Sequence, residues 1–231
     1  MCFKRWKRLA LLALTCASAL PARAIRLDST VYDMTPQQSF ISWSILNDSP
    51  RSNLYTITAW KIDRPGAGGE RRVDGSELEV VYSPLRFTLQ PGHRDYFKLY
   101  YRGPIDDRER YYRVQFKETP ATLIPWRKRR QGLDAVPVVS VSAILVVRPR
   151  KMVFRYEVDE AAGTLKNIGN TWFRVIVQQG CQGDDESASQ LALLPGDVWH
   201  NDAVNIHNRK YIVALGRYHK LGQGCFAGQP P

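Results

Sequence analysis

Short runs of β-branched and aromatic residues, each stopped by a turn-forming stretch, follow one another along most of the chain. The run at 39–46 ends at an Asn-Asp-Ser-Pro stretch at 47–50, and the run at 96–101 ends before a Gly-Pro pair at 103–104. Runs of this length and spacing are typical of β-sandwiches. No segment keeps a 3.6-residue apolar period long enough for a long helix, so the sequence predicts an all-β fold.

A second series of such runs begins after Pro149. Proline lacks a backbone N–H and cannot continue a central strand, so we place a domain boundary at this residue. The sequence therefore predicts a first sandwich domain over residues 25–149 and a second, smaller β-sandwich domain over residues 150–231.

The N-terminal segment has the three parts of a secretory signal peptide. Basic residues precede an apolar run from Leu9 to Leu20, which is short for a transmembrane helix, and Ala22-Arg23-Ala24 has the small-x-small form that signal peptidase cleaves. We expect residues 1–24 to be removed, which leaves Ile25 as the first residue of an exported protein. An N-terminal anchor helix is the alternative.

The net positive charge of the mature chain is smaller than that of the full sequence. The formal charge is +11, but the signal segment carries five basic residues and no acidic ones, so the mature chain is left at +6. A basic run at 127–130 stands beside Trp126, but no interleaved aromatic residues or recognition module accompany it. We interpret it as a solvated loop rather than a phosphate-binding patch. We expect no nucleic-acid partner and no membrane insertion of the mature chain.

Sequence motifs of catalysis or metal binding are missing from the chain. There is no nucleophile elbow, no phosphate-binding glycine loop, and no metal-ligand spacing around His200 or His207. The acidic pair Asp106-Asp107 is followed by alternating basic and acidic residues and is interpreted as a surface turn rather than a carboxylate dyad. The sequence thus favours a binding protein without metal or cofactor over an enzyme, although catalytic residues can be scattered along a chain.

Two cysteines, Cys181 and Cys225, remain after the signal segment is removed. An even pair in an oxidising compartment favours a disulfide, and two buried free thiols are the alternative.

The segment 135–147 is longer than the strands of a small sandwich usually are. Its odd positions are all apolar, its even positions include Ser140 and Ser142, and Pro137 removes one ladder hydrogen bond. Two interpretations stay open. The segment is either a long core strand, or a strand that serves its own core at its C-terminal end and offers apolar residues to a partner at its N-terminal end.

The order of these features resembles the periplasmic pilus chaperones of the PapD type. The closer resemblance is to the alternative branch that serves CFA/I-like fimbriae and the E. coli common pilus. The motifs that carry it are Leu89-x-Pro91-Gly92, Tyr101-Arg102-Gly103-Pro104, Glu109-Arg110-Tyr111-Tyr112-Arg113-Val114, Phe116-Lys117-Glu118-Thr119-Pro120, Ala143-Ile144-Leu145-Val146-Val147 followed by Arg148-Pro149, and Leu165-x-Asn167-x-Gly169-Asn170.

This resemblance implies two immunoglobulin-like domains in a boomerang arrangement. It implies a periplasmic chaperone that lends a β-strand to pilus subunits and delivers them to an outer-membrane usher, without a cofactor. The face expected to enter the subunit's groove consists of Pro137, Val139, Val141 and Ala143. Leu145 and Val147 are expected to pack in the chain's own core.

The resemblance breaks at the residues that anchor the subunit's C-terminal carboxylate. The PapD branch uses an arginine of the first strand and a lysine of the donor strand, and alignment puts Ser29 and Ile144 at those positions. Arg113 is our first candidate for a replacement anchor and Arg26 the second, because a guanidinium binds a carboxylate through two parallel hydrogen bonds. A solvent-facing strand residue is the alternative for Arg113.

Two rival functions remain at this stage. One is a secreted two-domain β-sandwich protein that binds carbohydrate or a host surface through Trp60, Trp126 and Trp172. The other is a secreted hydrolase with a dispersed site.

Overall fold

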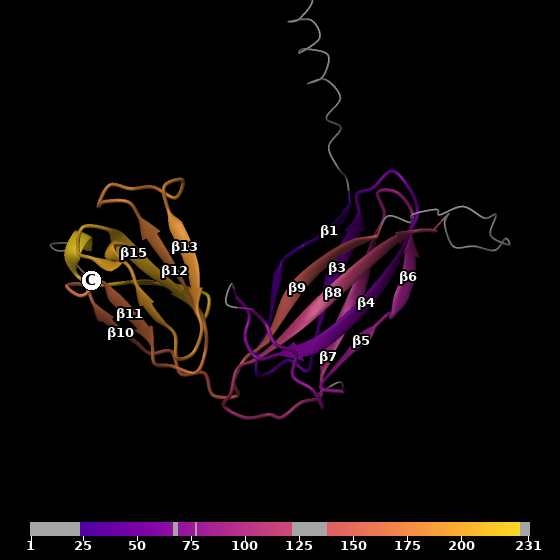
Figure 1. The fold of residues 1–231 in the computed structure, drawn as a ribbon, viewed down its shortest axis with the longest axis horizontal. Coiled ribbons are helices and arrows are strands. Elements are labelled where there is room, and N and C mark those ends of the chain that lie inside the picture. Colours follow the sequence, from indigo (N-terminus) through magenta and orange to yellow (C-terminus); the bar gives the residue numbers. More distant parts are fainter. Residues whose placement is uncertain (1–23, 67–68, 77, 122–137, 227–231) are drawn as a thin grey trace, which may run out of the picture.

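The computed structural model describes residues 24–66, 69–76, 78–121 and 138–226, which form two β-sandwich lobes (Figure 1). Residues 1–23 of the expected signal peptide, the basic run at 127–130 and Pro137 lie outside the described residues. The helical elements with described bounds, η2 (Asp202–Val204) and η3 (Gly224–Phe226), are short 3-10 turns. The predicted all-β class is confirmed, and no helix in the described ranges has the length and apolar character needed to cross a membrane.

The first lobe consists of two facing sheets, with strand orders β1-β3-β7-β5 and β2-β9-β8-β4-β6. The strands are β1 (Ile25–Leu27), β2 (Val31–Met34), β3 (Phe40–Asn47), β4 (Asn53–Ile62), β5 (Val80–Ser83), β6 (Arg86–Leu89), β7 (Arg94–Tyr101), β8 (Arg110–Pro120) and β9 (Val139–Val147).

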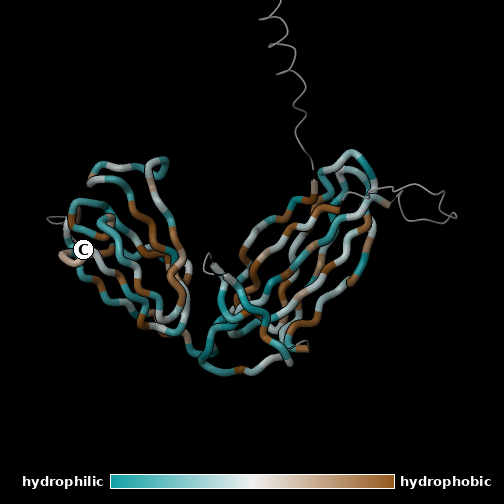
Figure 2. The backbone as a smooth tube through the Cα atoms, in the orientation of Figure 1, coloured by the Kyte–Doolittle hydropathy of each residue, from teal (hydrophilic) through white to brown (hydrophobic). Residues whose placement is uncertain are grey.

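The core of this lobe follows from the period-two alternation of its strands, which is visible along the tube in Figure 2. On β8, Tyr112, Val114 and Phe116 are fully buried between the sheets, whereas the intervening Arg113 and Gln115 are only partly buried. Burying side chains of this size contributes about 1.5–3 kcal/mol each relative to leaving them exposed, so this face holds the two sheets together.

The first segment of the lobe contributes to both sheets. Its β1 half pairs with β3 in an antiparallel manner, and after a short crossover its β2 half pairs with β9 in parallel. The β2–β9 ladder covers only the end of β9, from Ile144 to Val147. This partial cover decides which part of β9 has an open edge.

The second lobe is a smaller sandwich with strand orders β10-β11-β14 and β13-β12-β15-β16. Its core includes Leu165, Phe173, Val175 and Ile212, all fully buried. The strands are β10 (Tyr156–Asp159), β11 (Thr164–Asn167), β12 (Phe173–Gln178), β13 (Ser189–Leu193), β14 (Val198–His200), β15 (Arg209–Ala214) and β16 (Arg217–Lys220).

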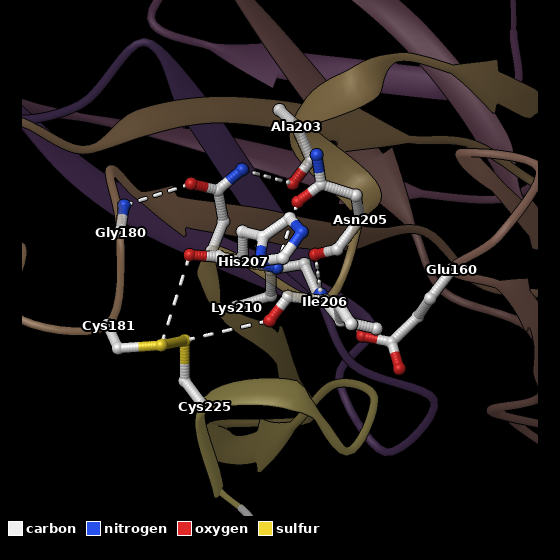
Figure 3. Close-up of a disulfide and its surroundings, with 10 residues drawn as sticks. Glu160, Gly180, Cys181, Ala203, Asn205, Ile206, His207, Lys210 and Cys225 are labelled. Carbon is white, nitrogen blue, oxygen red and sulfur yellow. Dashed lines mark hydrogen bonds and ion pairs between the residues drawn. A yellow bond between two sulfur atoms is a disulfide. The ribbon is translucent and has the colours of Figure 1, made fainter.

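A disulfide joins Cys181 and Cys225 in this lobe, with their Cα atoms 5.1 Å apart, as the sequence predicted. It ties the segment after β12 to η3, beside the backbone carbonyls of Ile206 and His207 (Figure 3). The bond therefore fixes the C-terminal segment against the turn that precedes β15.

The chain passes from one lobe to the other between Val147, where β9 ends, and Tyr156, where β10 begins. The proposed boundary at Pro149 falls in this connection, and we keep 25–149 and 150–231 as the proposed domains. Figure 1 shows the two lobes meeting near this connection and diverging away from it.

Candidate functional site

The N-terminal half of β9 has an open edge. On one side β9 pairs with β8 along its whole length, from Val139 opposite Glu118 to Val147 opposite Arg110. On the other side no described strand pairs with it before Ile144, whose N–H donates to the Thr30 carbonyl at 2.9 Å. Backbone groups of a strand alternate in direction, so the N–H and C=O groups of residues 140 and 142 point to this open edge.

The open segment of β9, residues 139–143, has an apolar inward face. This face becomes more exposed toward the N-terminal end of the strand. Val139 is 38% exposed and Val141 is partly buried against the core, whereas Leu145 and Val147 are buried, as expected. Val139 lies opposite Glu118, and Val141 lies opposite the buried Phe116. Both valines thus extend the core face of the lobe beyond the point where β2 closes it.

Four residues were expected on the offered face, the face of β9 that would enter the subunit's groove. One of them lies outside the described residues and another is buried. Pro137 lies outside the described residues. Ala143 is fully buried in the core of its own lobe, opposite Val114. The residue lies one step before the β2–β9 ladder starts, where the two sheets already enclose its small side chain. We therefore limit the offered face to Val139 and Val141 among the described residues.

Arg113 lies on the opposite face of the same sheet, directly across from Ile144. Its guanidinium holds the Glu70 carboxylate through two hydrogen bonds, one from Nε at 3.0 Å and one from Nη2, and Nη1 donates to Ser142 Oγ at 3.3 Å. The Arg113 side chain is 21% exposed and that of Glu70 is 22% exposed. The Arg113 guanidinium therefore already holds a carboxylate in the forked geometry that an anchor requires.

Arg26, the second candidate anchor, lies elsewhere. It is exposed on β1, in the other sheet, with Leu46 as its register partner. The structure does not bring Arg26 together with Arg113, and its strand is not a neighbour of β9.

A buried polar network joins the two lobes just beyond β9. The Glu109 carboxylate accepts hydrogen bonds from Thr171 Oγ1 at 2.7 Å, from the Trp172 backbone N–H at 3.1 Å and from Arg148 Nη1 at 3.2 Å. Arg148 also pairs with Asp33 at 3.0 Å and lies over the Trp172 ring. Burial raises the pKa of Glu109, while the hydrogen bonds and Arg148 oppose that rise.

Apolar side chains from both lobes continue this contact. Tyr111, Ile144, Val146 and Leu194 belong to one buried cluster, against which Trp60 and Trp172 pack. A cleft of about 630 Å³ adjoins the cluster. Trp60 and Trp172 therefore serve the junction of the lobes rather than an exposed sugar-binding platform, and Trp126 lies outside the described residues.

The acidic residues weighed as a catalytic dyad are held by neighbouring groups. Arg110 donates to both oxygens of Asp106, at 2.6 and 2.7 Å, and Asp107 accepts from the Lys151 backbone N–H at 2.9 Å. The pKa of Asp106 is therefore lowered to about 2, chiefly by Arg110. Within the described residues, no three His, Cys, Asp or Glu side chains are gathered as a metal ion requires.

Comparison with curated proteins decides the family. The chain is 36% identical over 225 residues to EcpE of Escherichia coli K12, described as a probable fimbrial chaperone, and the match covers 96% of this chain and 94% of that protein. The chain belongs to the fimbrial chaperones. It is also 27% identical over 212 residues to the probable fimbrial chaperone EcpB of Klebsiella pneumoniae strain 342, covering 90% of this chain and 95% of that protein. No family model matches the sequence.

Two solved structures of bacterial chaperones share the fold. The SafB chaperone of Salmonella enterica, solved in complex with the SafA pilin, aligns with a TM-score of 0.54 at 15% identity, over 88% of this chain and 94% of that one. The periplasmic chaperone SfaE aligns with a TM-score of 0.53 at 16% identity, over 85% of this chain and 96% of that one. At such identities the likeness shows the fold alone.

Some features of this fimbrial chaperone were missed by sequence reasoning. The partner of Arg113, Glu70, lies 43 residues away in a loop whose pairing no local pattern reveals. Glu109 and Arg148 stand in the motifs of the family resemblance, but their joint role at the lobe junction was not predicted. One sequence signal could have indicated this role. Glu109 stands just before a long alternating run, and Arg148 stands just after another.

Proposed function

We propose that this chaperone binds pilus subunits by adding the open segment of β9 to a subunit that lacks a strand. The observation that carries the proposal is the open edge at residues 139–143, because it combines backbone groups that no described strand pairs with and an apolar face. Strand addition uses these two features, with the backbone supplying hydrogen bonds and alternate side chains filling pockets. Membership of the fimbrial chaperones and the SafB–SafA complex support this partner class.

The geometry limits how far the added strand can run. From Ile144 onward the edge of β9 is occupied by β2, so a subunit strand that runs parallel to β9, as β2 does, has to stop there. Its last residue would arrive beside Ile144, whose neighbour on β8 is Arg113. We propose that Arg113 receives the subunit's C-terminal carboxylate, in place of the arginine and lysine that the PapD branch uses.

The setting of the proposed function is the periplasm. The expected signal peptide supports export, and family membership supports delivery of the subunit to an outer-membrane usher as the following step. The proposed chemistry consists of hydrogen bonding and apolar contact, so it requires neither a cofactor nor a metal ion.

The proposal is tested by exporting the chaperone together with a pilus subunit from the same gene cluster. The subunit should be recovered as a soluble complex with the chaperone and should aggregate when expressed alone, since its groove would be open. A chaperone that purifies as a monomer while the subunit stays soluble without it would contradict the proposal.

The anchor makes a separate prediction about Glu70 and Arg113. Replacing Arg113 with alanine should weaken binding of the subunit about 10- to 100-fold, which is the range for hydrogen bonds to a charged group. Glu70→Gln should strengthen binding, because Glu70 occupies the guanidinium that the subunit's carboxylate needs. Arg26→Ala serves as the matched control and should leave the affinity unchanged. Dissociation constants can be measured by competition between chaperone variants for one subunit.

A subunit extended by two residues at its C-terminus gives the internal check, because its carboxylate is moved away from the site. Arg113→Ala should then have little further effect. An equal loss for native and extended subunits would mean that Arg113 acts through the fold rather than on the carboxylate.

A further inference from the structure

The Glu118 carboxylate is a buried anion at the end of the first lobe where β9 begins. The residue is 6% exposed and accepts hydrogen bonds from Asn53 Nδ2 at 2.9 Å, from the Tyr55 hydroxyl at 3.2 Å and from the Ile25 backbone N–H at 2.9 Å. No basic side chain of the described residues forms an ion pair with it. A buried carboxylate without a cation is costly, since neutral donors replace only part of its hydration.

A second polar atom of the same cluster has no donor. Asn53 Oδ1 is buried and accepts no hydrogen bond from the described part of the chain. The cluster therefore has spare accepting capacity at both Glu118 and Asn53, although these two side chains contact each other. A group with several N–H donors and a positive charge would satisfy it.

The donor that is already present is the nitrogen of Ile25. This residue is 8% exposed at the start of β1, and it is the residue that the Ala22-x-Ala24 motif places first in the exported protein. Hydrolysis of the Ala24–Ile25 peptide bond leaves the carboxylate on Ala24 and the amine on Ile25. At neutral pH that amine takes up a proton, so a neutral donor becomes an ammonium with three N–H groups.

We propose that removal of the signal peptide creates the cation that Glu118 lacks among the described residues, so that the Ile25 ammonium and the Glu118 carboxylate form a buried ion pair. The proposal takes cleavage after Ala24 as its premise. Processing then stabilises the folded first lobe in a way that the uncleaved precursor cannot reproduce, because there the same nitrogen is a neutral amide. The ion pair also lies beside the open segment of β9, since Glu118 is the register partner of Val139.

The test compares two mature forms, one that starts at Ile25 and one that retains Ala24, each with Glu118 and with Glu118→Gln. Retaining Ala24 moves the ammonium one residue along the chain and leaves an amide at Ile25. Masses of the purified chains establish the starting residue. Retaining Ala24 should lower the folding equilibrium constant at least about tenfold when Glu118 is present, and less than about twofold in Glu118→Gln. Urea unfolding of all four proteins measures both effects.

If Glu118→Gln fails to fold, a second measurement tests the ion pair without that variant. The N-terminal amine of the Ile25 form should react with an amine-acylating reagent at least about tenfold more slowly than that of the Ala24 form, because it is buried and paired. Equal labelling rates would overturn the proposal. So would an equal effect of Ala24 in both backgrounds, or an exported protein that starts at a residue other than Ile25.

Discussion

Replacing Val139 and Val141 together with asparagine should abolish recovery of a soluble complex between the chaperone and its pilus subunit. Each substitution removes an apolar side chain from the proposed groove and buries an amide without a partner. Together these changes cost about 5 kcal/mol or more, which lowers the affinity by more than about three orders of magnitude. Asparagine is preferred to aspartate because Val139 lies opposite Glu118, where a second carboxylate would add like-charge repulsion. The measurement is the amount of subunit that co-purifies from the periplasm.

The matched control is Ser140→Asn, which places the same side chain on the opposite face of the same segment. It should leave the complex intact, whereas Ser142 is unsuitable because it contacts Arg113. The valine double variant should keep a cooperative melting transition, since Val139 is 38% exposed and Val141 is only partly buried. Normal recovery of complex would refute the offered face, and an unfolded variant would favour the other interpretation, a long core strand.

Replacing Leu145 with aspartate should unfold the first lobe. Leu145 is fully buried, with Tyr112 on one side and Tyr32 on the other, in a core whose described buried residues include no basic side chain to pair with a carboxylate. Burying this charge, or taking up a proton to avoid it, together with the lost packing of the leucine costs an amount comparable to the roughly 5–15 kcal/mol by which domains are stable. Loss of the cooperative transition in circular dichroism tests this prediction. Leu145→Ala is the graded companion and should cost about 2–5 kcal/mol.

Ser140→Asp provides the control for added charge, because Ser140 is exposed. It should melt close to the original temperature. A Leu145→Asp protein with a melting transition near that of the parent would show that the C-terminal half of β9 is not part of the core.

The sequence was sufficient for those features that follow from local alternation. The turn-bounded strands, the buried face of β8 and the burial of Leu145 and Val147 all follow from period-two alternation, which neighbouring residues encode. The disulfide was predictable from an even cysteine count and an export signal, because the two cysteines that remain allow a single pairing.

Other features depend on register and on distant contacts. That β2 covers β9 only from Ile144 onward depends on where the first segment crosses between sheets, which no residue pattern specifies. Ala143 is buried although its alternation matches that of Val139, because it lies further along β9, where the two sheets already enclose its small side chain. The contact of Glu118 with Ile25 spans 93 residues and depends on how the two sheets meet at one end of the lobe.

The central claim, that a subunit strand pairs with the open edge of β9, is tested most directly by amide hydrogen exchange. The N–H groups of Ser140 and Ser142 should exchange quickly in the free chaperone, because they point along the open edge, and those of Val141 and Ala143 should be slower because they face β8. In the complex with the subunit, the amides of Ser140 and Ser142 should become strongly protected. Exchange at these two amides that is as fast in the complex as in the free chaperone would contradict the account.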